Sequence, residues 1–436
     1  MIETDNLPRG FTESMKAQLK ENFGAYLEAL GDRHVSGVRI NTLKANPDSV
    51  FKELGTEPER VPWAPTGFYI PESSLYTRHP FYYAGLYYIQ EPSAMTPVTW
   101  LSPEPGDKVL DLCAAPGGKS TQAACYLGEA GALYSNDPSA SRCKALLKNI
   151  ELSGIGNAVI TCADPAELAD VYPEYFDRVL VDAPCSGEGM FRKDRAVMKA
   201  YLEHGPEYFA PIQRSVLSQA YRMLKPGGHM VYSTCTFSCL EDEENILWFT
   251  GEYPDMEVLK MTKLYPHEVK GEGHFVTLLH KKGESSSASA RIPAGKTSGG
   301  SIPKDFLDFM GRTGLVLEEE RVYLRDEYIY YLPKGAVLDR RIHYIRTGLL
   351  FGRMRNGRFE PSQAFAMSLT AKDWDRALIL KSSDDRVMRY LKGETIEADD
   401  DYEGYRLVCI EDWPLGWVKQ SGKRCKNKYY PGWRYE

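Results

Sequence analysis

The stretch KVLDLCAAPGGKST, residues 108–121, decides the fold class predicted for this chain of 436 residues. A short apolar run leads through a turn of small residues into a segment with helical spacing. This order brings backbone amides and a helix N-terminus close to a ligand. Alternating strands and helices follow, so we predict an α/β fold: a doubly wound, Rossmann-like domain with helices on both faces of a mostly parallel sheet. The further strands are predicted at 132–137, 158–164, 178–184 and 229–235, and the helices at 118–127, 139–152 and 207–224.

Three acidic residues, Asp137, Asp164 and Asp182, stand at the ends of the second, third and fourth predicted strands. Ligands in such sheets bind at the carboxyl ends of the strands, and an acid after the second strand suits a ribose diol. The turn does not favour a nucleotide phosphate. Cys113 stands where a P-loop has its first glycine, and G-x-G-x-x-G is absent. A cofactor that carries adenosine without phosphate fits better, which points to S-adenosylmethionine.

Two cysteines follow neighbouring predicted strands, Cys185 in VDAPCSGEGMFRKD (181–194) and Cys235 in YSTCTFSCLEDEEN (232–245). We therefore expect both thiols on the same rim of the sheet, among turn-forming residues where a thiol is accessible and its pKa can be lowered. A thiolate that adds to carbon 6 of cytosine makes carbon 5 nucleophilic enough to take a methyl group. Asp182 is placed to contact N3 of the base, as a protonated carboxyl or as a hydrogen-bonding group. The spacing leaves open which thiol attacks.

The run from Asp111 to Lys119 resembles the cofactor loop of the Sun-type RNA cytosine-5 methyltransferases. Further matches are RINTLK (39–44), YYIQEPSAM (87–95) and PHEVKGEGHF (266–275), so the resemblance covers roughly residues 39–280. It implies that Cys235 is the nucleophile and that Cys185 serves product release. It also implies a cofactor pocket lined by Cys113, Ala114, Ala115, Pro116, Gly117, Gly118, Lys119, Asp137, Asp164 and Asp182.

The segments 346–367 and 414–434 resemble the C-terminal parts of the RsmF-like bacterial branch of that family. The resemblance implies a PUA-like module and, as substrate, cytosines in the decoding region of small-subunit (16S) rRNA, within free rRNA or a 30S subunit. Trp417, Tyr429, Tyr430 and Trp433 either stack on unpaired bases or form the core of a small β-barrel. The residues expected to contact RNA are Arg39, Arg192, Lys193, Arg195, Lys423, Arg424 and Lys426.

A Ser- and Gly-rich stretch at 283–303 is the clearest predicted linker. It separates the predicted N-terminal α+β RNA-binding unit (1–75) and methyltransferase domain (76–282) from an intermediate domain (304–375) and the β-rich PUA-like module (376–436). Within the N-terminal unit a helix is predicted over 11–30 and a strand near 35–46.

The chain has a net charge of -7 and nine cysteines, and it shows neither a signal-peptide pattern nor an apolar stretch of membrane-spanning length. We therefore expect reduced thiols in a cytoplasmic monomer that has no bound metal and no membrane partner. Two alternatives stay open. One is the same chemistry on tRNA. The other is a ribosome-assembly factor that binds rRNA without catalysis, which the intact Cys185, Cys235 and Asp182 oppose.

Overall fold

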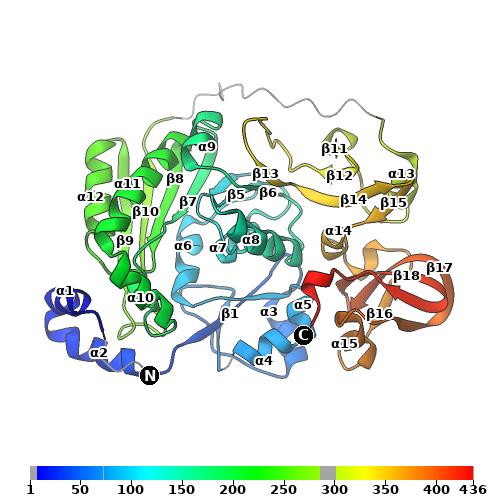
Figure 1. Cartoon of the computed structure of the whole chain (residues 1–436), viewed down its shortest axis with the longest axis horizontal. Helices are drawn as coiled ribbons and strands as arrows, with labels where there is room; N and C mark the ends of the chain where they lie inside the picture. The colour runs from blue at the N-terminus through cyan, green and yellow to red at the C-terminus, as the bar shows by residue number, and fades with distance from the viewer. Residues whose placement is uncertain (1–6, 72, 285–300, 436) are drawn as a thin grey trace.

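The computed structural model of the chain describes residues 7–71, 73–284 and 301–435. Its largest element is an eight-stranded sheet in the order β13-β6-β5-β4-β7-β8-β10-β9. The central strands run parallel, and β10 (His274–Lys281) and β9 (Met256–Leu264) extend the sheet antiparallel. The parallel strands are β4 (Lys108–Asp111), β5 (Ala132–Asn136), β6 (Ala158–Thr161), β7 (Phe176–Asp182) and β8 (Leu224–Thr234). The predicted strands are confirmed (Figure 1).

Helices cover both faces of this sheet. One face packs against α6 (Thr96–Leu101), α7 (Gly118–Leu127) and α8 (Ala140–Leu152), and the other against α9 (Pro165–Val171), α11 (Pro206–Met223) and α12 (Glu243–Glu252). Neighbouring residues of a strand point to opposite faces, so Leu133 of β5 joins the first core and Tyr134 joins the second. The doubly wound, Rossmann-like fold is confirmed.

The N-terminal unit begins with two helices, α1 (Arg9–Leu19) and α2 (Phe23–Gly31), joined by the 3-10 turn η2 (Lys20–Asn22). A single helix over 11–30 was the sequence prediction, and it is wrong because Lys20 adopts a positive φ of 50° that interrupts the helix. The two helices lie beside α10 (Arg195–Glu203) in Figure 1 and pack on Phe191 and Phe237. A three-stranded sheet follows, in the order β2-β1-β3.

That small sheet comprises β1 (Ser36–Ile40), β2 (Gly67–Ile70) and β3 (Tyr87–Ile89), with α3 (Pro47–Leu54), α4 (Ser73–Arg78) and α5 (Pro80–Tyr83) around it. The strand predicted near 35–46 is thus confirmed over its first part. The remaining short turns of 3-10 helix are η3 (Ser93–Met95), η4 (Glu188–Met190), η5 (Glu319–Arg321), η6 (Ala371–Asp373) and η7 (Pro431–Trp433).

The predicted linker, 283–303, lies mostly outside the described residues. After it, α13 (Lys304–Met310) and α14 (Gln363–Met367) pack on a four-stranded sheet in the order β11-β12-β14-β15. Its strands are β11 (Val322–Arg325), β12 (Tyr328–Tyr331), β14 (Leu349–Arg355) and β15 (Arg358–Pro361). One strand of this region, β13 (Tyr344–Thr347), leaves that sheet and pairs antiparallel with β6 at the edge of the methyltransferase sheet.

The segment that leads into β13 covers part of the methyltransferase core. The Tyr172 hydroxyl donates to the Val337 carbonyl at 2.9 Å, and the Tyr175 hydroxyl donates to the Gly335 carbonyl at 3.0 Å. Ile342 is buried against the same core as Tyr134. The sequence did not predict this arrangement, in which residues after the linker complete the sheet and its core.

The last module contains β16 (Leu378–Leu380), α15 (Asp385–Leu391) and the long strands β17 (Ile396–Ile410) and β18 (Trp413–Asn427). Trp417, Tyr429 and Trp433 are buried, whereas Tyr430 is 58% exposed. The core alternative therefore holds for three of the four aromatics, and only Tyr430 is available for stacking. Tyr429 and Trp433 share one apolar core with the N-terminal unit, and the chain ends beside α5 (Figure 1).

Among the residues that the structure describes, no helix is both long and apolar enough to cross a membrane.

Candidate active site

Two thiols meet where β7 and β8 end. Asp182, the last residue of β7, pairs with Ser233 near the end of β8, so the loops that follow begin side by side. They bring Cys185 Sγ to 3.3 Å from Cys235 Sγ, as the neighbouring strand ends predict. The hydrogen bond to Cys235, together with burial, raises the pKa of the Cys185 thiol well above its usual value. Cys185 therefore keeps its proton at neutral pH.

Both thiols line a cavity of about 570 Å³ at the carboxyl ends of the parallel strands. Asp137, Asp164 and Asp182 line the same cavity. A smaller chamber of about 190 Å³ adjoins it and shares Cys113, Ala115 and Asp182 with it. The structure thus brings the predicted acids, the small-residue turn and both cysteines to one place.

The turn between β4 and α7 leaves room for a ligand close to the backbone. Gly117 has a φ of 110°, a conformation that favours glycine. A Cβ on Gly118 would lie 3.1 Å from the Tyr88 ring, so only a glycine fits there without displacing that ring. Burial raises the pKa of the Cys113 thiol, which keeps this wall of the cavity uncharged.

Asp137 lines the cavity with one carboxylate oxygen that accepts no hydrogen bond from the described residues. Its Oδ1 accepts a hydrogen bond from the Ser139 amide at 3.0 Å. Its buried Oδ2 accepts none from any residue in the described part of the chain, although the Arg142 guanidinium lies 3.2 Å away. Asp164 stands at the rim, where it caps α9 by accepting from the Ala166 amide at 2.8 Å. This donor and acceptor set fits the adenosine half of S-adenosylmethionine.

Asp182 is held by charged and polar partners. Lys119 Nζ donates to its Oδ2 at 2.7 Å, and the Ser233 hydroxyl donates to its Oδ1 at 2.8 Å. Burial alone would raise the pKa of the Asp182 carboxyl, but Lys119 and His274 outweigh it and hold that pKa below its ordinary value. Asp182 is therefore ionised, so of the two forms considered from the sequence the structure supports the hydrogen-bonding carboxylate. Lys119 supplies the positive charge at this point.

A buried carboxylate joins the two cysteine loops. Glu241 Oε1 accepts from the Ser186 hydroxyl at 2.5 Å, and its Oε2 accepts from the Ser186 amide at 3.0 Å and from Gln213 Nε2 at 2.8 Å. Ser186 follows Cys185, and Glu241 belongs to the loop that follows Cys235. The sequence reasoning missed this link, although the acidic run EDEE directly after the second cysteine motif was a signal for it.

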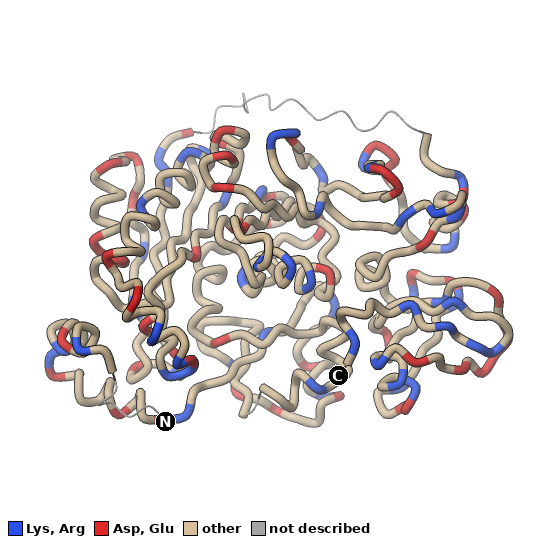
Figure 2. Tube along the Cα trace, viewed as in Figure 1, with Lys and Arg blue, Asp and Glu red and all other residues tan. Residues whose placement is uncertain are grey.

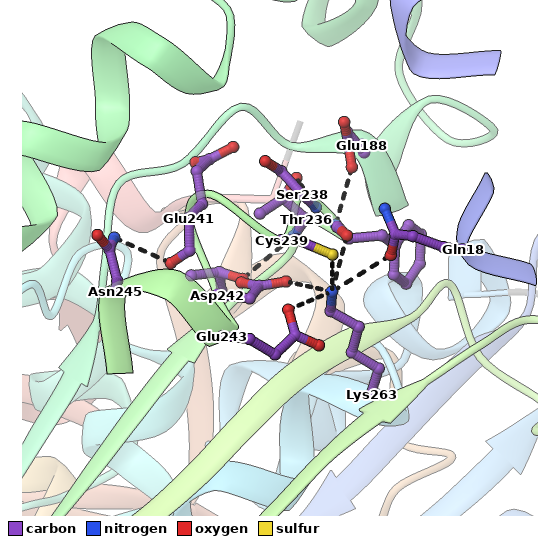
Figure 3. A network of polar contacts seen from close by, with 12 residues as sticks. Gln18, Glu188, Thr236, Ser238, Cys239, Glu241, Asp242, Glu243, Asn245 and Lys263 are labelled. Carbon is purple, nitrogen blue, oxygen red and sulfur yellow. Dashed lines mark hydrogen bonds and ion pairs between the residues drawn. The ribbon is translucent and has the colours of Figure 1, made fainter. Parts of the chain in front are cut away.

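Lys263 of β9 anchors the far side of the Cys235 loop, as Figure 3 shows. Its buried ammonium lies 3.3 Å from Asp242 and 2.8 Å from Glu243 and donates to the Phe237 carbonyl at 2.8 Å. Asp242 in turn accepts from the Thr234 hydroxyl at 2.7 Å. The Asp242 and Glu243 carboxylates raise the pKa of Lys263 against the effect of burial. The cysteine loop is thus fixed by ionic contacts that lie outside the cavity.

Arg39 was predicted to contact RNA, and this prediction is wrong. Its side chain is buried, with 1% exposed. The guanidinium donates to the Gly118 carbonyl at 3.0 Å, to the Thr121 hydroxyl at 2.6 Å and to Gln90 at 2.8 Å. Arg39 therefore supports the first turn of α7, directly behind the cofactor loop.

Arg192 is also unavailable to RNA, because only 5% of its side chain is exposed. It forms a bidentate ion pair with Glu272, with distances of 2.8 and 2.9 Å, and donates to the Ala29 carbonyl at 2.7 Å. The prediction that it contacts phosphate is therefore wrong. Its neighbours Lys193 and Arg195 are exposed, as are Lys423, Arg424 and Lys426, and their RNA contacts stay predictions.

Solved structures share this fold. A methyltransferase homologue from Pyrococcus horikoshii is 29% identical with a TM-score of 0.55, and the match covers 63% of this chain and 96% of that one. NSun6 from the same organism, solved with SFG, an analogue of S-adenosylmethionine, matches at 22% identity and a TM-score of 0.56 over 64% of this chain and 99% of that one. The second likeness concerns the fold alone. Fold and site together define an S-adenosylmethionine-dependent methyltransferase.

The family described as 16S rRNA methyltransferase RsmB/F matches residues 98–282. The RsmF N-terminal, first C-terminal and PUA domains match residues 7–92, 308–369 and 377–435. Ribosomal RNA small subunit methyltransferase F of Escherichia fergusonii is 31% identical over 96% of this chain and 95% of its own length. The chain belongs to the RsmF family of 16S rRNA methyltransferases.

Proposed function

We propose that this enzyme methylates carbon 5 of cytosine in the decoding region of small-subunit (16S) rRNA, with S-adenosylmethionine as cofactor. The observation that carries the proposal is the pair of thiols 3.3 Å apart in a cavity that three acidic strand ends also line. A methyltransferase acting on an amino group or a ribose hydroxyl needs no nucleophilic thiol, whereas cytosine carbon 5 requires one for its activation.

Cys235 is the nucleophile in this proposal. Cys235 first loses its thiol proton to water, and the thiolate then bonds to carbon 6 of the flipped-out cytosine, which shifts electron density to carbon 5. S-adenosylmethionine, when bound, supplies the methyl group that carbon 5 takes. Carbon 5 then loses its proton to water, and the bond between Cys235 and carbon 6 breaks. The contacts of Glu241 and Asp242 support this role, because they hold the Cys235 loop against the neighbouring loop and against Thr234.

Cys185 serves product release. Because its pKa is raised, it retains a proton, and its sulfur lies 3.3 Å from that of Cys235. It can therefore relay a proton to Cys235 as the latter leaves carbon 6, taking up a proton from water as it gives its own, which prevents the Cys235 thiolate from adding again. A chain without Cys185 would complete the methyl transfer and stay attached to its RNA.

Lys119 and Asp182 face the pyrimidine edge of the base. The ammonium donates toward N3, where negative charge develops as the sulfur adds, and the Asp182 carboxylate contacts the same edge. The cofactor lies along Cys113, Ala114, Ala115, Pro116, Gly117, Gly118, Lys119, Asp137, Asp164 and Asp182. All of them except Gly117 line one or both of the two adjoining cavities, which supports this assignment.

The rRNA, free or within a 30S subunit, is held in this proposal by a monomer with RNA-binding parts at 1–75 and 376–436. Lys193 and Arg195 follow the Cys185 loop, and Figure 2 shows Lys and Arg along β18, where Lys423, Arg424 and Lys426 lie. Exposed cations there would pair with phosphates and position the target cytosine without reading its sequence.

The test is transfer of labelled methyl groups from S-adenosylmethionine to three substrates in parallel: unmethylated 30S subunits, naked 16S rRNA and tRNA. Bisulfite sequencing then locates 5-methylcytosine. The proposal expects label in decoding-region cytosines of rRNA or subunits. Label in tRNA alone would show that the substrate is tRNA and not rRNA. Cofactor binding without label in any of the three would favour an assembly factor without catalysis.

A further inference from the structure

His274 begins β10, next to the strand that carries the catalytic loop. β10 runs antiparallel to β8, and Phe275 pairs with Thr234, so His274 stands beside the position of Cys235. The imidazole is buried, with 2% of the residue exposed. The cofactor and base contacts assigned above do not use it.

The imidazole points at Asp182. Its Nε2 lies 3.6 Å from Asp182 Oδ1, the oxygen that also accepts from the Ser233 hydroxyl. Within the described ranges Nε2 has no hydrogen-bond partner. Buried polar atoms in folded proteins almost always have one, so an unpaired nitrogen aimed at a carboxylate that lines the reaction cavity needs a reason. A movement of a few tenths of an ångström would bring it to hydrogen-bonding distance of the carboxylate.

Three charged groups face the imidazole: Lys119 at the start of α7, Asp182 at the end of β7 and Glu91 after β3. Burial and the nearby Lys119 lower the pKa of His274, so the ring is neutral and carries one N–H. In the free site the Lys119 ammonium contacts Asp182 Oδ2 at 2.7 Å, and the Ser233 hydroxyl donates to Oδ1. A base that draws the Lys119 ammonium toward N3 would leave the carboxylate short of one donor.

We propose that His274 is a positioning residue for Asp182, donating from Nε2 to Oδ1 when Lys119 turns to the cytosine. This inference rests on the proposed function and deepens it. The replacement donor keeps the Asp182 carboxylate ionised and aimed at the base while Lys119 is engaged elsewhere. Without it Asp182 would take up a proton at a higher pH, since the loss of a donor to a carboxylate raises its pKa.

Three substitutions separate this role from simple packing. His274→Phe keeps the ring volume and removes the donor. His274→Gln restores an amide N–H near the position of Nε2, whereas the shorter side chain in His274→Asn cannot reach that position. The matched control is His280→Phe, on the same strand, whose ring lies against His229 rather than beside Asp182. Calorimetry with S-adenosylmethionine and thermal unfolding check that each variant is folded.

The readout is the pH dependence of steady-state methylation of 16S rRNA. For His274→Phe and His274→Asn we expect kcat to fall about tenfold with the KM for RNA unchanged, and the acid limb of the profile to move up by about one pH unit. His274→Gln should restore most of the wild-type kcat and most of the wild-type position of the acid limb. His280→Phe should match the wild type.

An unchanged acid limb in His274→Phe, or equal losses in the Gln and Asn variants, would overturn the positioning role while the wild type still forms 5-methylcytosine. A loss confined to the KM for RNA would do the same, because it would indicate a packing defect at the RNA surface. A wild-type enzyme that forms no 5-methylcytosine on any substrate would instead refute the proposed function, and this role with it.

Discussion

The Sγ atoms of Cys185 and Cys235 lie 3.3 Å apart although 50 positions separate the two residues in the chain. The parallel pairing of β7 with β8 makes this possible, since it ends both strands at the same rim. Glu241 then ties the loop after one cysteine to the loop after the other through Ser186. The pair is therefore built into the sheet and does not depend on a ligand to assemble it.

Cys235→Ala should abolish methyl transfer, by at least about a thousandfold, because the neighbouring thiol of Cys185 has a raised pKa and keeps its proton. Cofactor affinity should stay within about twofold of the wild type, since the acids that line the cofactor side are untouched. Labelled methyl transfer and calorimetry measure the two quantities. Cys239→Ala is the matched control, because Cys239 contacts Lys263 instead of Cys185. Substantial transfer by Cys235→Ala would rule out this nucleophile.

Arg39→Met should weaken S-adenosylmethionine binding by about tenfold or more while RNA affinity stays the same. The guanidinium supports the first turn of α7 through Gly118 and Thr121, and a Met side chain of similar length cannot donate to either. Calorimetry with the cofactor and a filter-binding assay with 16S rRNA separate the two effects. A loss of RNA affinity alone would restore Arg39 as an RNA contact.

The double substitution Lys193→Gln with Arg195→Gln should weaken RNA binding and leave cofactor binding unchanged. Both side chains are exposed beside the cavity loops, so their removal should weaken rRNA binding uniformly. The slope of the logarithm of the binding constant against the logarithm of the salt concentration should fall by about two, one for each lost phosphate contact. Cofactor binding should not change. Glu203→Gln, at the other end of α10, serves as a control for substitution in this helix. A salt dependence equal to that of the wild type would show that neither cation meets a phosphate.

Ile342→Ala should lower the free energy of unfolding by roughly 2–4 kcal/mol. Ile342 precedes β13 and is buried in the methyltransferase core, although it lies after the linker in sequence. Arg340→Ala, two residues earlier and exposed, should have almost no effect. Urea unfolding measures both. Equal stability of the two variants would mean that the segment before β13 is not part of the core.

Asp111→Asn should stabilise the protein more at pH 8 than at pH 5. Burial raises the pKa of the Asp111 carboxyl to about 7. A group whose folded pKa lies above its unfolded value binds more protons in the folded state, so its contribution is present at low pH and is lost as pH rises through the folded pKa. The neutral amide avoids that loss, by roughly 1 kcal/mol or more. Melting temperatures at pH 5 and pH 8 test the sign.

The sheet could be predicted from the sequence because its signals are local. Each parallel strand is an apolar run followed by turn residues, and the glycine turn at 117–118 marks the start of α7. The rim that holds Cys185, Cys235 and the three acids follows from strand order alone, since the carboxyl ends of parallel strands share one edge.

The features of the fold and site that the sequence did not predict depend on contacts between distant segments, for which one sequence carries no signal. Arg39 has the same local pattern whether it faces RNA or the back of α7, and only the position of the N-terminal sheet decides between them. The pairing of β13 with β6 joins segments almost two hundred residues apart, from Tyr344 to Thr161. The aromatics of the last module are ambiguous for the same reason, because a core and a stacking platform use the same residue types.

The most direct test of the central claim is to follow Cys185→Ala with 16S rRNA and S-adenosylmethionine on denaturing gels, and to identify the attached peptide by mass spectrometry. The account predicts an RNA-linked protein that carries a methylated cytosine on Cys235, because methyl transfer is complete and release is blocked. A nucleotide attached to any other residue, or an adduct that forms with Cys235→Ala and not with Cys185→Ala, would contradict it and reverse the roles of the two thiols.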